Sequence, residues 1–175
     1  MAFRDQPEVV LIAGAAGSGK SILGEALARA GSAVLLDLDT LTNPLLEALA
    51  DANVFGDRHW NDPLLRSIVR PARYAALRNA ISAQSGRVVA VAPWSAELAG
   101  GTEWAALSAA LGGSPHVIWL RADPQLLASR RARRALDRDA HVVDAAAAPV
   151  VPHLELDATL PTSDQVAELR GALNW

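Results

Sequence analysis

The sequence of 175 residues contains no cysteine, which excludes a disulfide framework and a thiolate metal site. Its longest apolar runs, such as VVLIAGAAG and VVAVAPW, are far shorter than the roughly 20 residues that a membrane-spanning helix needs. The net charge of −3 disfavours a protein that binds nucleic acid by bulk electrostatic attraction. The polar, acid-containing start MAFRDQPE lacks the pattern of a signal or transit peptide. We therefore expect a soluble, cytoplasmic protein that binds neither nucleic acid nor a membrane.

Lysine is almost absent as well. Lys20 is the one lysine among 16 basic residues, and all the others are arginine. It lies in the stretch GAAGSGKS, which matches the pattern G-x-x-x-x-G-K-[ST] of a phosphate-binding loop. A buried-strand pattern precedes this stretch and a segment with helical spacing follows it, which is the context that such a loop requires. The sequence therefore predicts a nucleotide-binding protein.

Each part of this loop suits a nucleotide phosphate. Glycines let the backbone curl so that its N–H groups point inward, and the start of the helix adds the positive end of its dipole. Lysine reaches the β- and γ-phosphates as a compact charge, whereas the broad planar fork of arginine fits poorly inside a small loop. Ser21 offers a hydroxyl to Mg²⁺. The residues expected to contact ATP are Gly14, Ala15, Ala16, Gly17, Ser18, Gly19, Lys20, Ser21 and Ile22.

Strands and helices alternate along the chain. Strands are expected at residues 9–13, 33–39, 88–92, 116–120 and 153–157, and helices at 20–31, 72–84, 103–111, 123–136 and 163–173. Asp123 before Pro124 is a typical helix start, and Thr162 with Gln165 predicts a capping box. The alternation predicts one α/β domain over residues 1–175, a three-layer sandwich around a five-stranded parallel sheet. Ligands should then lie at the carboxyl ends of the strands.

The rest of the sequence disfavours two classes of P-loop protein. A guanine-specific GTPase needs an N-K-x-D motif, which would require a second lysine. AAA+ motors and transport ATPases usually carry an apolar strand that ends in Asp-Glu, but VVAVAPW ends in no acid and HVIWL is followed by Arg121. The acids at the end of an apolar strand are instead Asp37 and Asp39, in the stretch VLLDLDTL.

The stretches GAAGSGKS, LDLDTL and DPQLLASRRARRALDRD give the chain a resemblance to the small P-loop kinases of the shikimate kinase, gluconate kinase and chloramphenicol phosphotransferase kind. In that group the acid after the second strand faces the acceptor hydroxyl, and an arginine-bearing lid follows the fourth strand. The resemblance implies an acceptor-binding insert at about 40–84 and a lid at about 123–148. The chain has Ala92-Pro93-Trp94-Ser95 where shikimate kinase has a Gly-Gly-Gly turn, which argues against shikimate as the acceptor.

Asp37 and Asp39 can both lean over the carboxyl edge of the sheet, near the phosphate loop. One can hold a magnesium-bound water, while the other accepts the proton of an attacking hydroxyl. We assign Asp39 as the base in contact with the acceptor, and Asp37 with Ser21 to the metal. The alternative for either acid is that it only caps a helix that begins near Thr40.

Arg130, Arg134 and Arg138 share one face of an expected helix through i, i+4 spacing. Because phosphoryl transfer needs positive charge around the γ-phosphate, we expect Arg134 or Arg138 to reach the phosphates. The resemblance implies that Arg130 stacks near the adenine. Arg131 and Arg133 are expected to belong to a solvated face.

The segment 40–84 is long for a simple crossover. Arg58 and Trp60 within it combine a charge with an aromatic plate, which suits a polar, ring-like or anionic acceptor. Trp94, just past the third strand, is expected to point toward the same cleft. The alternative for the segment is a helix with a buried tryptophan and solvated ends. Weaker candidates flank the start of the next helix: Arg70 and Arg73.

The sequence thus predicts an ATP- and Mg²⁺-dependent kinase of a small hydroxyl-bearing molecule, such as a sugar, sugar acid, polyol or antibiotic-like compound. Either a monomer or a homodimer is compatible with this activity. A nucleoside or nucleotide kinase is the alternative within the enzymes. A nucleotide-binding regulatory module without an acceptor is the alternative outside them. Asp39 discriminates between these classes, because a pure binding module needs no base at that position.

Overall fold

The computed structural model describes residues 6–134 and 147–175, so that Arg138 and residues 135–146 of the expected lid lie outside the described residues. The strands are β1 (Glu8–Gly14), β2 (Val34–Asp37), β3 (Arg87–Val91), β4 (His116–Arg121) and β5 (Leu154–Asp157). The helices are α1 (Lys20–Ala30), α2 (Leu38–Asp51), α3 (Pro63–Ser82), α4 (Gly101–Ala110), α5 (Pro124–Arg134) and α6 (Thr162–Leu173), with a short 3-10 turn, η1 (Glu97–Ala99).

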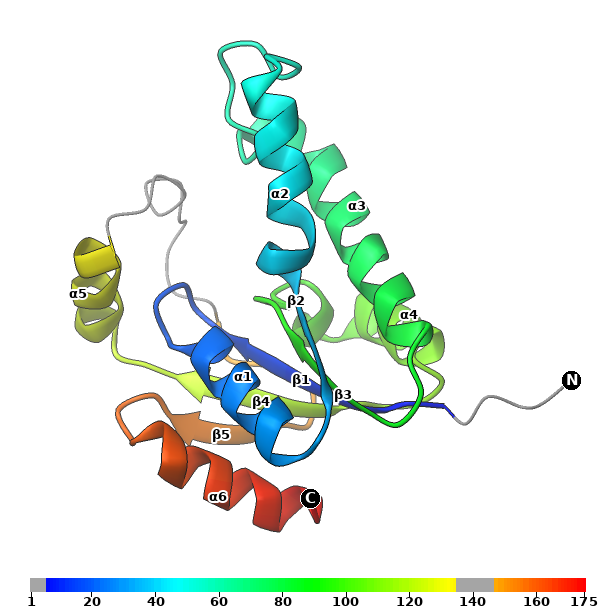
Figure 1. The fold of residues 1–175 in the computed structure, drawn as a ribbon, viewed down its shortest axis with the longest axis vertical. Coiled ribbons are helices and arrows are strands. Elements are labelled where there is room, and N and C mark those ends of the chain that lie inside the picture. Colours follow the sequence, from blue (N-terminus) through cyan, green and yellow to red (C-terminus); the bar gives the residue numbers. More distant parts are fainter. Residues whose placement is uncertain (1–5, 135–146) are drawn as a thin grey trace, which may run out of the picture.

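The five strands form one parallel sheet in the order β2-β3-β1-β4-β5 (Figure 1). In the central strand β1, Val9 and Leu11 enter the core on one face of the sheet, while Val10 and Ile12 enter the core on the other. Both faces are therefore buried, which explains why β1 is a continuous apolar run rather than an alternating pattern. The predicted five-stranded parallel sheet is confirmed.

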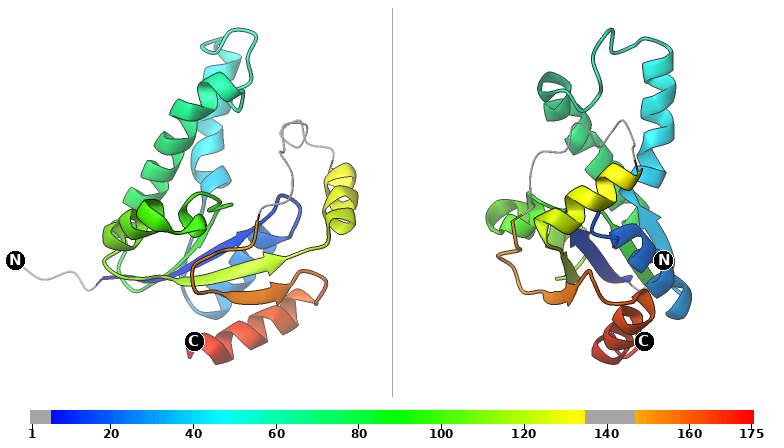
Figure 2. Two further views of the ribbon diagram at one scale, coloured as in Figure 1. Left: turned by 180° about the vertical axis from the view of Figure 1, so that it is seen from behind. Right: turned by 90° about the vertical axis from the view of Figure 1, so that its left-hand side faces the viewer.

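Helices cover both faces of the sheet (Figure 2). Leu23 and Leu27 of α1 pack with Leu169 of α6 in the core on one side. The second half of α3 and α4 supply the core on the other side, through residues such as Leu77 and Leu107. These layers form the predicted three-layer sandwich. None of the described helices combines the length and the apolar character needed to cross a membrane.

Two helices project from the carboxyl edge of the sheet as an arm, defined here as residues 38–73 of α2, the joining loop and the first part of α3 (Figure 1). The sequence predicts a helix that begins after Pro71, but α3 begins at Pro63 and runs through Pro71. Asp62 caps this start, because its carboxylate accepts a hydrogen bond of 2.9 Å from the Leu64 amide. The Pro71 ring lies at the surface, where a proline is tolerated more easily than in a packed interior.

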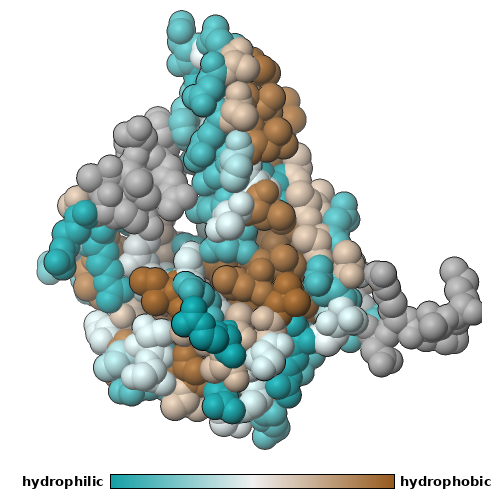
Figure 3. Space-filling view, viewed as in Figure 1, coloured by the Kyte–Doolittle hydropathy of each residue, from teal (hydrophilic) through white to brown (hydrophobic). Residues whose placement is uncertain are grey.

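The arm exposes large apolar side chains. Leu45 of α2 is 66% exposed, and Leu64 and Ile68, one turn apart on α3, are 66% and 70% exposed. Figure 3 shows apolar surface along one side of the arm. Exposed apolar patches are typical of surfaces that bind a ligand or another protein surface.

The expected helix ends are correct in two places and wrong in one. Gly31 caps α1 through its amide, and the Asp123 carboxylate accepts a hydrogen bond of 2.7 Å from the Gln125 amide at the start of α5. The capping box of Thr162 and Gln165 is absent, since Pro161 is the N-cap of α6 and supplies no side-chain hydrogen bond. The Gln165 amide instead donates to the Asp157 carbonyl at 2.9 Å, which ties α6 to the end of β5.

Candidate active site

The loop between β1 and α1 has the geometry of an anion cradle. A Cβ on Gly14 would lie 2.8 Å from Ser18 Oγ and 2.9 Å from the Leu120 carbonyl, so only glycine fits. Gly17 and Gly19 have φ angles of 89° and 99°, which favour glycine. The Ser18 side chain is buried, and its Oγ has no hydrogen-bond partner among the described residues. An unsatisfied buried hydroxyl in a glycine-lined loop fits a bound phosphate oxygen.

Lys20 is the first residue of α1, so that it lies where the helix dipole is positive. Its ammonium group donates back to the Ala15 carbonyl at 3.4 Å, within the same loop. The contact is long for a hydrogen bond, and it holds the charge over the cradle. The Lys20 ammonium group therefore faces the loop, and its contact with the phosphates stays a prediction.

Asp37 joins the phosphate loop to the start of the arm. Its Oδ2 accepts a hydrogen bond of 2.7 Å from Ser21 Oγ. Its Oδ1 accepts from the amides of Asp39 and Thr40, at 2.9 Å and 3.3 Å, and thereby caps α2. The strand was expected to reach residue 39, but this cap ends β2 at Asp37 and begins α2 at Leu38. Asp37 is thus a helix cap with one oxygen and a partner of Ser21 with the other.

The Ser21–Asp37 pair has the chemistry of a partial Mg²⁺ site. Mg²⁺ prefers oxygen ligands and usually keeps several waters, with one or two protein groups and the substrate phosphates completing its shell. No group of three or more acidic, histidine or cysteine side chains that could hold a metal occurs in residues 6–134 and 147–175. The two oxygens at Ser21 and Asp37 fit an ion that is held mainly by phosphates and water.

Asp39 lies in the first turn of α2, and Arg73 of α3 holds it. The Arg73 guanidinium donates to Asp39 Oδ1 at 2.7 Å, to Asn43 Oδ1 at 2.8 Å and to Thr42 Oγ1 at 2.7 Å. The Asp39 side chain is 47% exposed, whereas that of Arg73 is 14% exposed. The largely buried arginine therefore fixes one carboxylate oxygen, while the carboxyl group as a whole still meets solvent.

Arg73 was expected to be a weak candidate, but it is the centre of this network. Its guanidinium also lies 4.9 Å from the centroid of the Trp60 ring. Trp60 is buried, as the packing alternative for this segment expected, and an arginine covers one of its faces. An acceptor therefore cannot use that face of the ring as a stacking plate in this structure, contrary to the expected role of Trp60.

The expected position of Trp94 in the cleft is wrong. Its side chain is 0% exposed and belongs to the core beside Tyr74, whose ring lies 5.3 Å away in an edge-to-face arrangement. Trp94 has a φ of 52°, an unusual value for a residue with a side chain. Its amide donates to the Tyr74 hydroxyl at 3.1 Å, which helps to hold this conformation. Trp94 fills the space beneath the end of β3 instead of lining the cleft.

A buried ion pair supports this aromatic pair. Arg70 donates to the Glu97 carboxylate at 2.9 Å and lies 4.2 Å from the centroid of the Tyr74 ring. The Glu97 side chain is only 3% exposed, so its charge depends on this partner. Burial raises the pKa of Tyr74 to about 12, and the Glu97 charge adds to the rise, so the phenol stays neutral at physiological pH.

Arg58 lies in the loop that joins α2 to α3, at the outer end of the arm (Figure 1). Its exposed side chain pairs with Asp62 at 3.6 Å. Exposed pairs of this kind contribute little to stability, so the side chain can be redirected at small cost. Arg58 thus pairs within its own loop, and its expected role toward an acceptor stays a prediction.

The arginines of α5 contact the outer side of the phosphate loop. Arg130 donates to the Ser18 carbonyl at 2.9 Å and to the Ala158 carbonyl at 3.0 Å, which bridges the loop and the turn after β5. Arg131 was expected to be solvated, but its Nη1 donates to the Ala16 carbonyl at 3.3 Å. Arg134 is described only by its place at the end of α5, and Arg138 lies outside the described residues.

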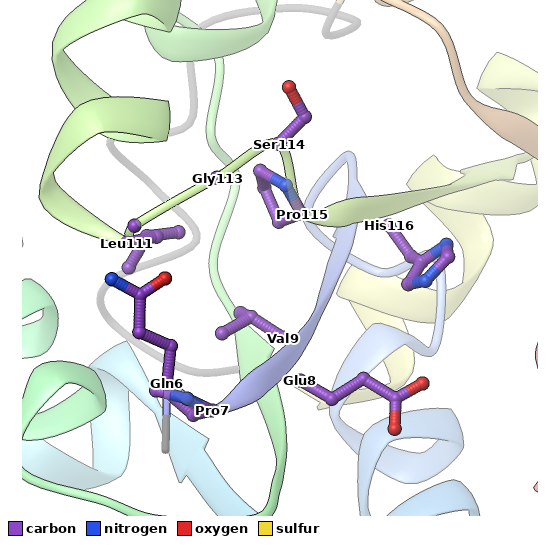
Figure 4. Close-up of a pocket in the computed structure, with 10 residues that line it drawn as sticks. Gln6, Pro7, Glu8, Val9, Leu111, Gly113, Ser114, Pro115 and His116 are labelled. Carbon is purple, nitrogen blue, oxygen red and sulfur yellow. The ribbon is translucent and has the colours of Figure 1, made fainter. Parts of the chain in front are cut away.

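A pocket at the opposite end of the sheet does not share these features. It has a volume of about 130 Å³ and lies beside the first residues of β1 and β4 (Figure 4). Its acid, Glu8, is committed to Arg87 at 3.4 Å and to the Trp175 indole at 2.9 Å. Ligands of parallel α/β sheets bind at the carboxyl ends of strands, whereas this pocket lies at the amino ends. The candidate active site is therefore the phosphate-loop edge.

The parallel sheet and the glycine-lined loop at this edge are those of a P-loop protein. Residues 9–151 match the model of the family AAA_33, described as AAA domain, and the chain belongs to that family. Comparison with curated protein sequences gives no match.

Solved structures share the fold over nearly the whole chain. The APS kinase of Mycobacterium tuberculosis, in complex with AMPPNP and APS, has a TM-score of 0.67 at 18% identity, covering 98% of this chain and 99% of that one. A gluconokinase from Sinorhizobium meliloti 1021 has a TM-score of 0.60 at 20% identity, covering 98% of both chains. The shikimate kinase of Aquifex aeolicus vf5 has a TM-score of 0.57 at 11% identity, covering 95% of this chain and 96% of that one. The predicted resemblance to small P-loop kinases is confirmed at the level of fold.

Proposed function

We propose that the protein is a kinase that transfers the γ-phosphate of ATP to a hydroxyl group of a small molecule. The observation that carries this proposal is the 2.7 Å hydrogen bond between Ser21 and Asp37, because it joins the phosphate loop to the segment that bears Asp39. A phosphate-binding loop alone would suit any nucleotide-binding protein. A second acid, two residues beyond one that meets the loop, supplies the base that transfer to a hydroxyl requires.

Each residue at this edge has a role in the proposed reaction. The loop amides and Lys20 bind the β- and γ-phosphates, and Ser21 with Asp37 holds the magnesium ion or its water. Asp39 accepts the proton of the acceptor hydroxyl at one carboxylate oxygen while Arg73 orients the other. ATP with Mg²⁺ supplies an activated phosphoryl group. Arg130 bridges the loop and Ala158, a location that suits its proposed contact with the adenine.

A nucleoside or nucleotide kinase and a regulatory module remain the alternatives. ADP formation should separate them from the proposed function. We expect slow release of ADP from ATP and Mg²⁺ alone, and a sharp increase with one member of a panel of sugars, polyols, nucleosides and hydroxylated antibiotics. A coupled spectrophotometric assay measures this rate. Binding of AMPPNP without any acceptor-dependent ADP formation would favour the regulatory module.

The charges at the base of the arm favour an uncharged acceptor. Arg73 is neutralised by Asp39, and Arg70 is neutralised by Glu97. Each of these two arginines is thus paired with a carboxylate at 2.9 Å or less. An anionic acceptor would have to displace one of these acids or approach Asp39 against like charge, which costs free energy. We therefore propose a neutral polyhydroxylated acceptor over a sugar acid or a nucleotide.

Matched pairs of compounds test this preference. D-glucitol and D-gluconate are both open chains that differ only at C1, and a nucleoside and its 5′-monophosphate differ by one phosphate group. We expect the neutral member to give a kcat/KM at least about tenfold higher, since even partly screened repulsion of a few kcal/mol exceeds that factor. Glu97→Gln, which leaves the Arg70 charge unpaired, should move the preference toward the acid. Faster phosphorylation of the anionic members by the wild-type protein would contradict the proposal while leaving the kinase activity intact.

A further inference from the structure

Three successive carbonyl groups of the phosphate loop face α5, and two neighbouring arginines hold them. Arg131 donates to the Ala16 carbonyl at 3.3 Å. Arg130 donates to the Ser18 carbonyl at 2.9 Å and, at the longer distance of 3.5 Å, to the Gly17 carbonyl. Both side chains come from the same turn of α5, so one helix donates hydrogen bonds to the outer side of the loop through two adjacent residues.

Holding these carbonyls fixes where the loop amides point. A peptide group is planar and nearly always trans, so its C=O and N–H point in opposite directions. The Ala16 carbonyl shares a peptide plane with the Gly17 amide, and the Ser18 carbonyl shares one with the Gly19 amide. When an arginine holds either carbonyl outward, the paired amide is turned toward the inside of the cradle. The Ser18 amide does not take part, because it donates to the Ala15 carbonyl at 3.1 Å.

The packing of α5 makes this contact close. A Cβ placed on Gly17 would lie 3.1 Å from the Leu127 carbonyl and 3.3 Å from the Arg131 Cγ. The Leu127 side chain is buried, which anchors the helix on the body of the protein. Glycine at position 17 thus permits the positive φ and also lets the Arg131 stem lie against the backbone.

We propose that Arg131 is a positioning residue for nucleotide binding, which acts on the phosphates through the Ala16–Gly17 peptide rather than by touching them. The inference rests on the proposed function, in that the loop binds ATP. A glycine-rich loop loses much conformational entropy when it is ordered around a ligand. Arg131 orders the peptide before ATP arrives and therefore lowers the cost of binding. The Arg131 charge lies on the outer side of the loop, next to the Ala16 carbonyl.

Arg131→Ala is the test, and Arg133→Ala is the matched control. Both changes remove one arginine from the same helix, but Arg133 is exposed and only Arg131 has a hydrogen bond to the loop. Isothermal titration calorimetry measures the Kd of Mg²⁺-AMPPNP, of Mg²⁺-tripolyphosphate and of adenosine. We expect Arg131→Ala to weaken both phosphate ligands by the same factor, roughly tenfold, as for the loss of a charge-assisted hydrogen bond. The Kd of adenosine and the behaviour of Arg133→Ala should stay unchanged.

Arg131→Lys, which keeps a donor that can reach the carbonyl, should recover part of the affinity, and its thermal unfolding checks that the fold is kept. Equal affinity of Arg131→Ala and wild type for tripolyphosphate would overturn the proposal. An equal loss in Arg133→Ala would also overturn it, because bulk positive charge would then explain the effect. Failure of the wild-type protein to bind AMPPNP would instead contradict the proposed function.

Discussion

Lys20→Ala should lower turnover severely while the protein stays folded. The Lys20 ammonium lies over the phosphate loop, 3.4 Å from the Ala15 carbonyl, and it takes no part in the core. Removing it takes away a fixed positive charge where the γ-phosphate gains charge in the transition state. Loss of one preorganised group of this kind lowers kcat by on the order of 10²–10³-fold. Acceptor-dependent ADP formation measures the rate, and circular dichroism measures the fold.

Lys20→Arg tests why a chain rich in arginine keeps a lysine at this position. The charge is retained, but the planar guanidinium is broader than the ammonium group and must fit inside a loop whose glycines leave little room. We expect this variant to be nearly as impaired as Lys20→Ala. Arg29→Ala, in the exposed last turn of the same helix, is the control and should keep normal activity. Near-normal turnover of Lys20→Arg would refute the steric explanation of the lone lysine.

The sheet and the phosphate loop could be predicted because their signals are local. A strand buried on both faces is a continuous apolar run, and the loop pattern follows such a run directly. The carboxylate of Asp37 was also within reach of sequence reasoning, because the end of a parallel strand places it at the ligand edge. What the sequence left open was whether Asp37 caps a helix or meets the metal site. In the structure one oxygen of Asp37 caps α2, and the other accepts a hydrogen bond from Ser21. Its contact with a metal stays a prediction.

The arm could not be predicted in the same way. Pro44 and Pro71 lie inside its two helices, and a proline normally indicates a helix boundary. Both prolines are exposed on their helices, where the ring is tolerated more easily than in a packed interior. The most connected residue of the site, Arg73, lies 34 residues from Asp39, so no local pattern marks the pair. In a chain with abundant arginine, only the fold distinguishes this one from its neighbours.

Aromatic residues were misjudged for a related reason. Trp94 follows a strand at the ligand edge, which favours a position in the cleft. A positive φ, however, turns its side chain into the core beside Tyr74.

Arg131 was misjudged in the opposite direction, because helical spacing placed it on a face without expected partners. The phosphate loop approaches that face only in the folded protein.

Asp39→Asn should lower kcat by about 10²–10⁴-fold, the range that a general base contributes. Asparagine has nearly the same shape as aspartate and still offers an oxygen to Arg73. The 2.7 Å hydrogen bond from the Arg73 guanidinium can therefore be kept. It cannot accept the proton of a hydroxyl group at neutral pH, which removes the chemical step alone. The Kd of AMPPNP should change by no more than about twofold, because the loop is untouched. Asp51→Asn, at the other end of α2, is the control and should behave as wild type.

Asp37→Asn separates the two acids. Asparagine caps helices as well as aspartate does, so α2 should persist. The loss of charge beside Ser21, whose hydroxyl lies 2.7 Å from the Asp37 carboxylate, should raise the Mg²⁺ concentration needed for half-maximal activity. Saturating Mg²⁺ should then restore most of the rate, which it cannot do for Asp39→Asn. If saturating Mg²⁺ rescues Asp39→Asn instead, the two roles are exchanged. Full activity of both variants would contradict the proposed kinase activity, because these are the two acids to which the proposed reaction assigns the base and the metal.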